Sequence, residues 1–213
     1  MGNLIKNLTV AGLILFNPLM SKVKAEVKGN VEYIRSQENQ NSYARLNAFY
    51  SLPKEISGFS LGEFYKNGDG YFGVSFLEKP VWNNISSRLR LEHDNEPLSE
   101  ASMGASFSIP NLPKDIFAKI SWDALWMNPK GKFVDKSVAG YFVETKLPHG
   151  FNLSTFAEFH LVKPEGITWK YGEINLGKKF GPFTLGYNPS LNSIRDGKLS
   201  PKFEHRVYGR VGF

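Results

Sequence analysis

The sequence predicts an all-β protein in which one up-and-down antiparallel sheet of about twelve strands closes into a barrel. Apolar and polar side chains alternate with a period of two residues along most of the chain after Glu26. No window of about 12 residues there holds the 3.6-residue spacing of an amphipathic helix. The alternating segments have strand length, and turn residues separate them at even spacing. The chain is therefore expected to consist almost wholly of β-hairpins.

The composition excludes several classes of protein. The chain has 213 residues, of which 41% are apolar and 22% are charged, so it lacks the composition of a disordered protein. It contains no Cys, which excludes disulfide scaffolds, thiolate zinc sites, iron-sulfur clusters and cysteine nucleophiles. The mean hydropathy of -0.30 argues against a bundle of transmembrane helices, each of which needs about 20 apolar residues.

Residues 1–25 are expected to be a cleaved secretory signal, and residues 26–213 the barrel. Lys6 precedes an apolar run at 8–16, and a small-x-small site follows at 23–25. The run is too short to cross a bilayer as a helix. The segment carries three Lys and no acid, so its removal leaves 23 basic and 20 acidic residues and lowers the net charge from +6 to +3. The basic character of the whole chain therefore predicts no nucleic-acid partner.

Twelve segments of strand length follow one another along the chain. The clearest alternation runs over 151–162, where only Phe156 breaks an otherwise polar face. The faces are poorly separated over 58–78 and 167–188, so ten or fourteen strands stay open as alternatives. The expected strands are 27–35, 42–52, 58–66, 70–78, 85–93, 101–109, 116–126, 137–146, 151–162, 167–178, 183–188 and 203–213.

The turns between these segments are of two kinds, which predicts two distinct ends of one cylinder. Short turns with proline, followed by an aromatic residue, recur about one hairpin apart, at Pro53, Pro113, Pro148 and Pro182. The turns between them are more polar and on average longer. The sequence also allows the longest, 188–202, to fold inward as a constriction.

The sequence leaves open which face of the sheet the barrel encloses. The polar face carries small residues over long stretches, for example Ser102, Gly104, Ser106 and Ser108. A soluble barrel encloses its apolar face, whereas an outer-membrane barrel turns that face toward lipid and encloses the polar one. Alternation alone does not distinguish the two arrangements. On the expected register of 116–126, Trp126 lies on the apolar face.

The C-terminal segment favours the membrane arrangement. Phe213, Val211 and Val207 alternate with charged or polar neighbours and end the chain on an aromatic residue. This pattern resembles the terminal strand of Gram-negative outer-membrane β-barrel proteins, from which Gly209 and His205 depart. The resemblance implies that Phe213, Val211 and Val207 are a signal for the barrel assembly machinery. It also implies export through the periplasm, outer-membrane lipid as surroundings, and proline turns on the periplasmic side.

The enclosed face predicts a narrow aqueous pore for small hydrophilic solutes of anionic or sugar-like character. Guanidinium groups bind carboxylate and phosphate bidentately, which favours anionic or hydroxyl-rich solutes. Alternatively, the arginines pair with Glu92, Glu158 and Glu204 in a salt-bridge ladder that stiffens and partly closes the barrel. In size, strand number and arginine content the chain resembles small monomeric porins such as the oligogalacturonate-specific family, at the level of architecture only. The expected pore-lining residues are Arg45, Arg88, Arg90, Lys119, Glu158, His160, Arg206 and Arg210.

Two other functions stay open. Some outer-membrane barrels are lipases or lipid A modifiers, and His93, Asp94 and Ser99 form the one candidate cluster at an outer rim. A solvated loop explains the same residues, so no catalytic residue, no metal and no cofactor is expected. A closed structural or recognition barrel is the third possibility, which the short loops disfavour.

Overall fold

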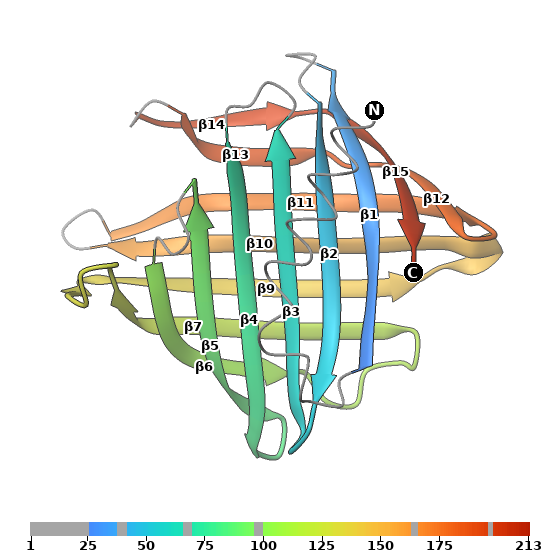
Figure 1. Ribbon diagram of the computed structural model, residues 1–213. Coiled ribbons are helices and arrows are strands. Elements are labelled where there is room, and N and C mark those ends of the chain that lie inside the picture. Colours follow the sequence, from blue (N-terminus) through green and yellow to red (C-terminus); the bar gives the residue numbers. More distant parts are fainter. Residues whose placement is uncertain (1–25, 38–41, 66–69, 96–99, 163–165, 196–197) are drawn as a thin grey trace.

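Twelve strands form a closed antiparallel barrel, which confirms the predicted fold class and strand number. The computed structural model describes residues 26–37, 42–65, 70–95, 100–162, 166–195 and 198–213. Each strand of the ring pairs with the next, and β15 pairs with β1 to close it (Figure 1). The ring contains, in order, β1 (Glu26–Ser36), β2 (Ser42–Leu52), β3 (Ile56–Tyr65), β4 (Tyr71–Trp82), β5 (Ile85–Asp94), β6 (Glu100–Ser108), β7 (Ile116–Met127), β9 (Lys136–Lys146), β10 (Phe151–Val162), β11 (Gly166–Phe180), β12 (Phe183–Tyr187) and β15 (Arg206–Gly212).

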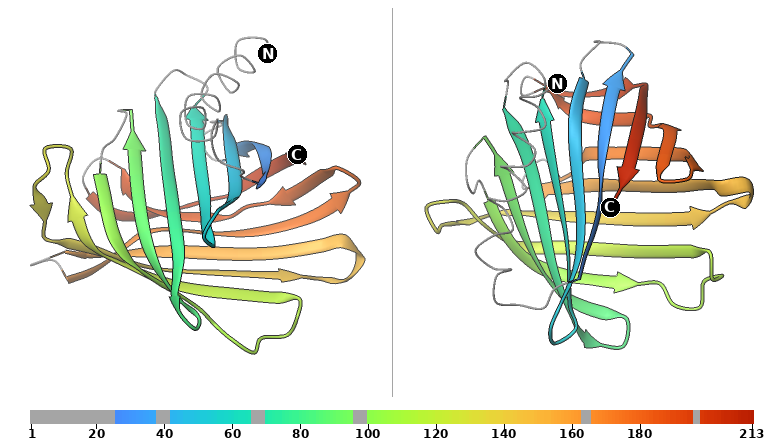
Figure 2. Two further views of the ribbon diagram at one scale, coloured as in Figure 1. Left: turned by 60° about the horizontal axis from the view of Figure 1, so that its bottom comes forward. Right: turned by 45° about the vertical axis from the view of Figure 1, so that its right-hand side comes forward.

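The front and back walls of the barrel cross each other. In Figure 1, β1 to β5 stand nearly upright, in alternating directions, whereas β9, β10 and β11 behind them lie across the page, and both views of Figure 2 show the same crossing. Closure of a sheet requires its strands to tilt from the barrel axis, so strands on opposite walls point in different directions. The first and last strands of the chain are neighbours in this ring.

The inward fold that the sequence allowed for 188–202 does not occur in the described residues. Ser190–Arg195 (β13) and Lys198–Glu204 (β14) form a hairpin, and β13 pairs with β11, so the segment extends the wall. The two breaks, at Asn188-Pro189 and at His205, lie opposite each other, because the amide of Asn188 donates to the carbonyl of Arg206 (2.8 Å). Proline has no amide hydrogen, which explains why one strand is interrupted there.

Two minor elements complete the described chain. Phe133–Val134 (β8) pairs with the end of β7, and Pro148–Gly150 (η1) is a single 3₁₀ turn between β9 and β10. Among the described residues no helix is long and apolar enough to cross a membrane.

The short turns lie at the same end of the barrel as Glu26 and Phe213, the first and last residues of the barrel sequence. Glu26 pairs with Ser51, next to the Pro53 turn, and the amide of Phe213 donates to the carbonyl of Gly29 (2.9 Å). The β4–β5 hairpin turns at Asn83, whose φ of 44° lies in the left-handed region that Asn adopts more readily than most residues. We call this the short-turn end. Most turns of the opposite end lie outside the described residues.

Polar residues fill the inside of the barrel and apolar residues cover its outside. On β6, Ser102 and Ser106 are buried, whereas Met103 is 62% exposed. On β15, Arg206 is buried, whereas Val207 is exposed. This distribution is the reverse of that in a soluble β-protein, whose apolar side chains share a dry interior. Large exposed apolar side chains of the outer face include Val27, Tyr33, Met103, Phe107, Ile120, Trp122, Leu125, Ile174, Leu176, Phe183, Leu185, Val207, Val211 and Phe213.

The prediction that Trp126 lies on the apolar face is wrong. Ser102 pairs with Trp126 and Gly104 pairs with Asp123, so β7 uses one more residue than β6 between the two pairs. Such a bulge reverses the alternation beyond it. It turns Trp126 into the barrel, where it is 1% exposed and its indole N–H donates to the carbonyl of Asp123 (2.9 Å).

Substitution can test the close approach of β6 and β7 at this bulge. A Cβ atom on Gly104 would overlap the carbonyl oxygen of Trp122, whereas the nearest atom to a Cβ on Gly209 is 3.7 Å away. We expect Gly104→Ala to lower the free energy of unfolding by about 2 kcal/mol, as overpacking does, and Gly209→Ala to leave it unchanged. The urea midpoint of the detergent-folded protein measures both. Equal midpoints for the two variants would contradict the close approach at Gly104.

Candidate functional site

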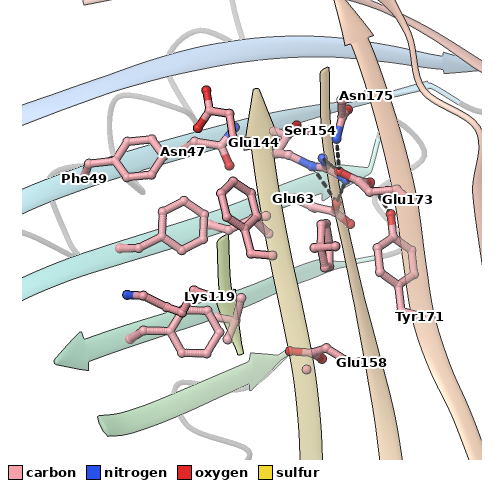
Figure 3. A pocket seen from close by; sticks show the side chains of 18 of the residues that line it. Asn47, Phe49, Glu63, Lys119, Glu144, Ser154, Glu158, Tyr171, Glu173 and Asn175 are labelled. Atoms are coloured by element: carbon pink, nitrogen blue, oxygen red, sulfur yellow. Dashed lines mark hydrogen bonds and ion pairs between the residues drawn. The ribbon is translucent and has the colours of Figure 1, made fainter. Parts of the chain in front are cut away.

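A cavity of about 1590 Å³ occupies the interior of the barrel. On β1 its lining runs from Glu26 to Ser36, roughly 33 Å of strand at about 3.3 Å per residue. Residues from ten of the twelve ring strands contribute to the lining, and Figure 3 shows several of them pointing into one space. The structure places all eight residues that the sequence assigned to a pore on this cavity: Arg45, Arg88, Arg90, Lys119, Glu158, His160, Arg206 and Arg210.

Arg90 on β5 is the centre of one ion-pair cluster. It is 2% exposed, and its guanidinium donates to both carboxylate oxygens of Glu158 on β10 (2.6 and 2.9 Å). It also contacts Asp123 on β7 (3.4 Å) and Glu92 on its own strand. Lys170 on β11 joins the same two glutamates, at 2.8 Å from Glu92 and 3.3 Å from Glu158. The cluster therefore links strands that are not neighbours in the sheet.

Arg88 and Lys119 extend this cluster toward the short-turn end. Arg88 lies between Asp123 (3.2 Å) and Glu78 (3.3 Å), and its guanidinium carbon is 3.8 Å from the centre of the Phe76 ring. Lys119 forms an ion pair with the other oxygen of Glu78. Both cations are thus held by carboxylates of other strands. We use "Arg90 cluster" for Glu78, Arg88, Arg90, Glu92, Lys119, Asp123, Glu158 and Lys170.

A second cluster surrounds Arg45 on β2. Its guanidinium binds Glu173 on β11 with two hydrogen bonds (2.9 and 3.0 Å) and Glu63 on β3 with another (2.9 Å). Glu32 on β1 lies 3.7 Å away. All four side chains are largely buried. Buried charges need such partners, because their removal from water is costly.

Arg206 and Arg210 on β15 complete the second cluster. Arg206 binds Glu204 (2.7 Å) and also donates to the hydroxyls of Tyr43 (3.0 Å) and Tyr171 (3.1 Å). Arg210 binds Glu32 (2.6 Å). We use "Arg45 cluster" for Glu32, Tyr43, Arg45, Glu63, Tyr171, Glu173, Glu204, Arg206 and Arg210.

The arginines are therefore paired, as in the ladder that the sequence left open. The three predicted partners, Glu92, Glu158 and Glu204, all take part. Among the described residues the lining carries as many acids as bases. The bases are Lys28, Arg45, Arg88, Arg90, Lys119, Lys170, Arg206 and Arg210, and the acids are Glu26, Glu32, Glu63, Glu78, Glu144, Glu158, Glu173 and Glu204.

Sequence reasoning missed several members of the two clusters. Two of them could have been found, because Glu32 and Glu63 lie directly opposite Arg45 on the neighbouring strands. Lys170 could not, because a bulge opposite Glu158 and Phe159 makes it the extra residue of β11. Alternation through Tyr171 would have placed it outside.

The structure describes only part of the candidate catalytic cluster. His93 and Asp94 end β5, and Ser99 lies outside the described residues. In the described part of the chain, no three His, Asp or Glu side chains form a group that could hold a metal ion.

Comparison with known proteins identifies the fold. No family model matches the sequence, and no curated protein matches it. Among solved structures, the barrel is similar to the NanC porin, with a TM-score of 0.58 and 9% sequence identity over 86% of this chain and 98% of that one. Two structures of OpdK from Pseudomonas aeruginosa, one with vanillate, match with TM-scores of 0.36 and 0.35 and 12% identity, over 90% and 86% of this chain and 63% and 62% of theirs.

The paired charges predict unequal effects of two substitutions. Arg45→Leu leaves Glu32, Glu63 and Glu173 without their shared cation, so we expect the free energy of unfolding to fall by about 3 kcal/mol. Lys28→Leu removes an ion pair with Glu26 in which both side chains are exposed, and we expect no measurable change. Urea titration in detergent measures both. A stable Arg45→Leu variant would show that the cluster does not hold the strands together.

Proposed function

We propose that this protein is an outer-membrane channel for small hydrophilic solutes. One observation carries the proposal: a cavity lined by charged and aromatic side chains runs along the inside of a closed barrel whose outer face exposes large apolar side chains. An apolar outer wall is stable against hydrocarbon, and hydrogen-bond closure of the ring leaves no free sheet edge in lipid. The fold likeness to a protein described as a porin supports the same function.

The proposal extends to the two ends of the sequence. Residues 1–25 act as the cleaved export signal, and they lie outside the described residues. Phe213, Val211 and Val207, all exposed on the outer face of β15, act as the signal read by the barrel assembly machinery. The short-turn end, which holds both Glu26 and Phe213, then lies on the periplasmic side.

The balance of charges on the lining bears on which solutes pass. A row of unpaired arginines would favour anions. Here the five lining arginines are all held by carboxylates, and acids and bases are equal in number. We therefore propose uncharged, sugar-like solutes rather than anions, with little selectivity between small ions.

Conductance tests the proposal. Folded protein, recognised by a band that shifts on heating in SDS, is added to a planar lipid bilayer in KCl solution. We expect discrete current steps. A bilayer that stays silent with protein whose band still shifts would overturn the channel. Release of fatty acid or a change in lipid A would instead favour the outer-membrane enzyme.

Two lining charges predict opposite changes in ion selectivity. Lys119→Gln removes one positive charge from the lining and leaves Glu78 with Arg88 as its remaining cation, so it should shift permeability toward cations about twofold, whereas Glu144→Gln should shift it toward anions. The reversal potential under a KCl gradient measures both. Lys178→Gln is the control, because Lys178 lies on the outer face against the rings of Phe151 and Phe180. Unchanged potentials in both lining variants would mean that ions do not pass these residues.

A further inference from the structure

Phenylalanines on three adjacent strands form a continuous inward surface near the short-turn end. Phe49 on β2 pairs across the sheet with Phe59 on β3, and Phe59 pairs with Phe76 on β4. The ring centres are 4.9 Å apart in the first pair and 6.1 Å apart in the second, and the second pair is stacked. All three line the cavity. We call these three residues the first aromatic wall.

A second set of phenylalanines lies on the other side of the ring. Phe117 on β7 lies 6.1 Å from Phe142 on β9, and Phe142 pairs with Phe156 on β10. These residues line the same cavity. In the order of the twelve-stranded ring, β10 is six strands from β3, so the two sets occupy opposing sides. We call them the second aromatic wall.

The free faces of the two walls belong to Phe49 and Phe117. Although both side chains point inward, Phe49 is 52% exposed and Phe117 is 45% exposed. By contrast, the guanidinium of Arg88 covers the ring of Phe76. The Nζ of Lys119 lies 5.8 Å from the centre of the Phe117 ring and leaves that ring half exposed. Aromatic rings exposed to water are costly in a cavity unless a ligand uses them. Phe49 and Phe117 are therefore the available stacking surfaces.

Polar groups border these rings. Ser154 on β10 lies directly opposite Glu144 on β9, and Asn152 and Asn47 line the same part of the cavity, as Figure 3 shows for Asn47, Glu144 and Ser154 around Phe49. The amide of Asn47 donates to Asn30 (2.9 Å). Carboxylate, hydroxyl and amide groups are suited to hydrogen bonds with hydroxyl groups.

The charge of this region disfavours an acidic ligand. Lys119 is neutralised by Glu78. Among the described residues no cation lies within 4 Å of the Glu144 carboxylate, so the charge left at this site is negative. A ligand with a flat apolar face, hydroxyl groups at its edge and no negative charge satisfies all three features. Pyranose rings of neutral sugars have that chemistry.

We infer that the two aromatic walls form a binding site for neutral oligosaccharides, in which Phe49 and Phe117 stack against pyranose rings and Glu144, Ser154 and Asn47 bind their hydroxyl groups. The inference rests on the proposed channel function and names its substrate class. The site lies between the short-turn end and the two ion-pair clusters, so a sugar that enters from the opposite, external end passes the charges before it meets the rings.

Two measurements test the site with maltotriose as the neutral probe and trigalacturonate as the acidic one. In a planar bilayer, maltotriose should interrupt the current, and trigalacturonate should do so at least about tenfold less effectively. Phe49→Ala and Phe117→Ala should each raise the half-blocking concentration of maltotriose about threefold to tenfold. Phe107→Ala removes an outward phenylalanine of β6 and should leave it unchanged. The heat-dependent band shift confirms that each variant is folded.

Calorimetric titration of the detergent-folded protein with maltotriose separates this inference from the channel function. Current steps without block or heat of binding would overturn the sugar site and leave the channel standing. Binding that weakens in Phe49→Ala, but with no current in any bilayer, would support the site and overturn the channel. Stronger block by trigalacturonate, or block that neither phenylalanine variant weakens, would contradict the inference.

Discussion

The architecture depends on ion pairs that cross the interior of the barrel. Hydrogen bonds of the sheet connect each strand only to its two neighbours, but Arg45 connects β2 to Glu173 on β11, and Arg90 connects β5 to Glu158 on β10. These contacts connect strands that no backbone hydrogen bonds join. They also account for a barrel that contains buried arginines and few buried apolar side chains, because each charge that leaves water has a partner of opposite sign.

The same pairing determines what the lumen offers to a solute. Once carboxylates hold the guanidinium groups, acids and bases of the lining balance, and the groups that border the open space include the Glu144 carboxylate, the Ser154 hydroxyl and the exposed aromatic rings. These lie nearer the short-turn end, where Phe49 and Phe117 border open space. Structural support and recognition thus use different residues of one cavity.

The sequence predicted the strands and most inward positions because a two-residue period needs no knowledge of neighbouring strands. It failed where the period itself changes. One bulge turns Trp126 inward, and another adds Lys170 to the lining. It failed also on contacts between distant walls: Glu173 is separated from Arg45 by 128 residues, and only barrel closure brings the two together. In 58–78 the alternation did not show which aromatic residues face inward, because both the outer face and this part of the lumen are apolar.

The contact between Phe213 and Gly29 joins the last residue of the chain to its first strand. Loop closure over such a separation has a high entropic cost, and contacts distant in sequence form late. Until β15 pairs with β1, the growing sheet has two unpaired edges, one at β1 and the other at the strand added last, and each can pair with a foreign strand. This constrains the order of events during biogenesis. The barrel closes only after β15 has been added, and the two unpaired sheet edges need protection until then.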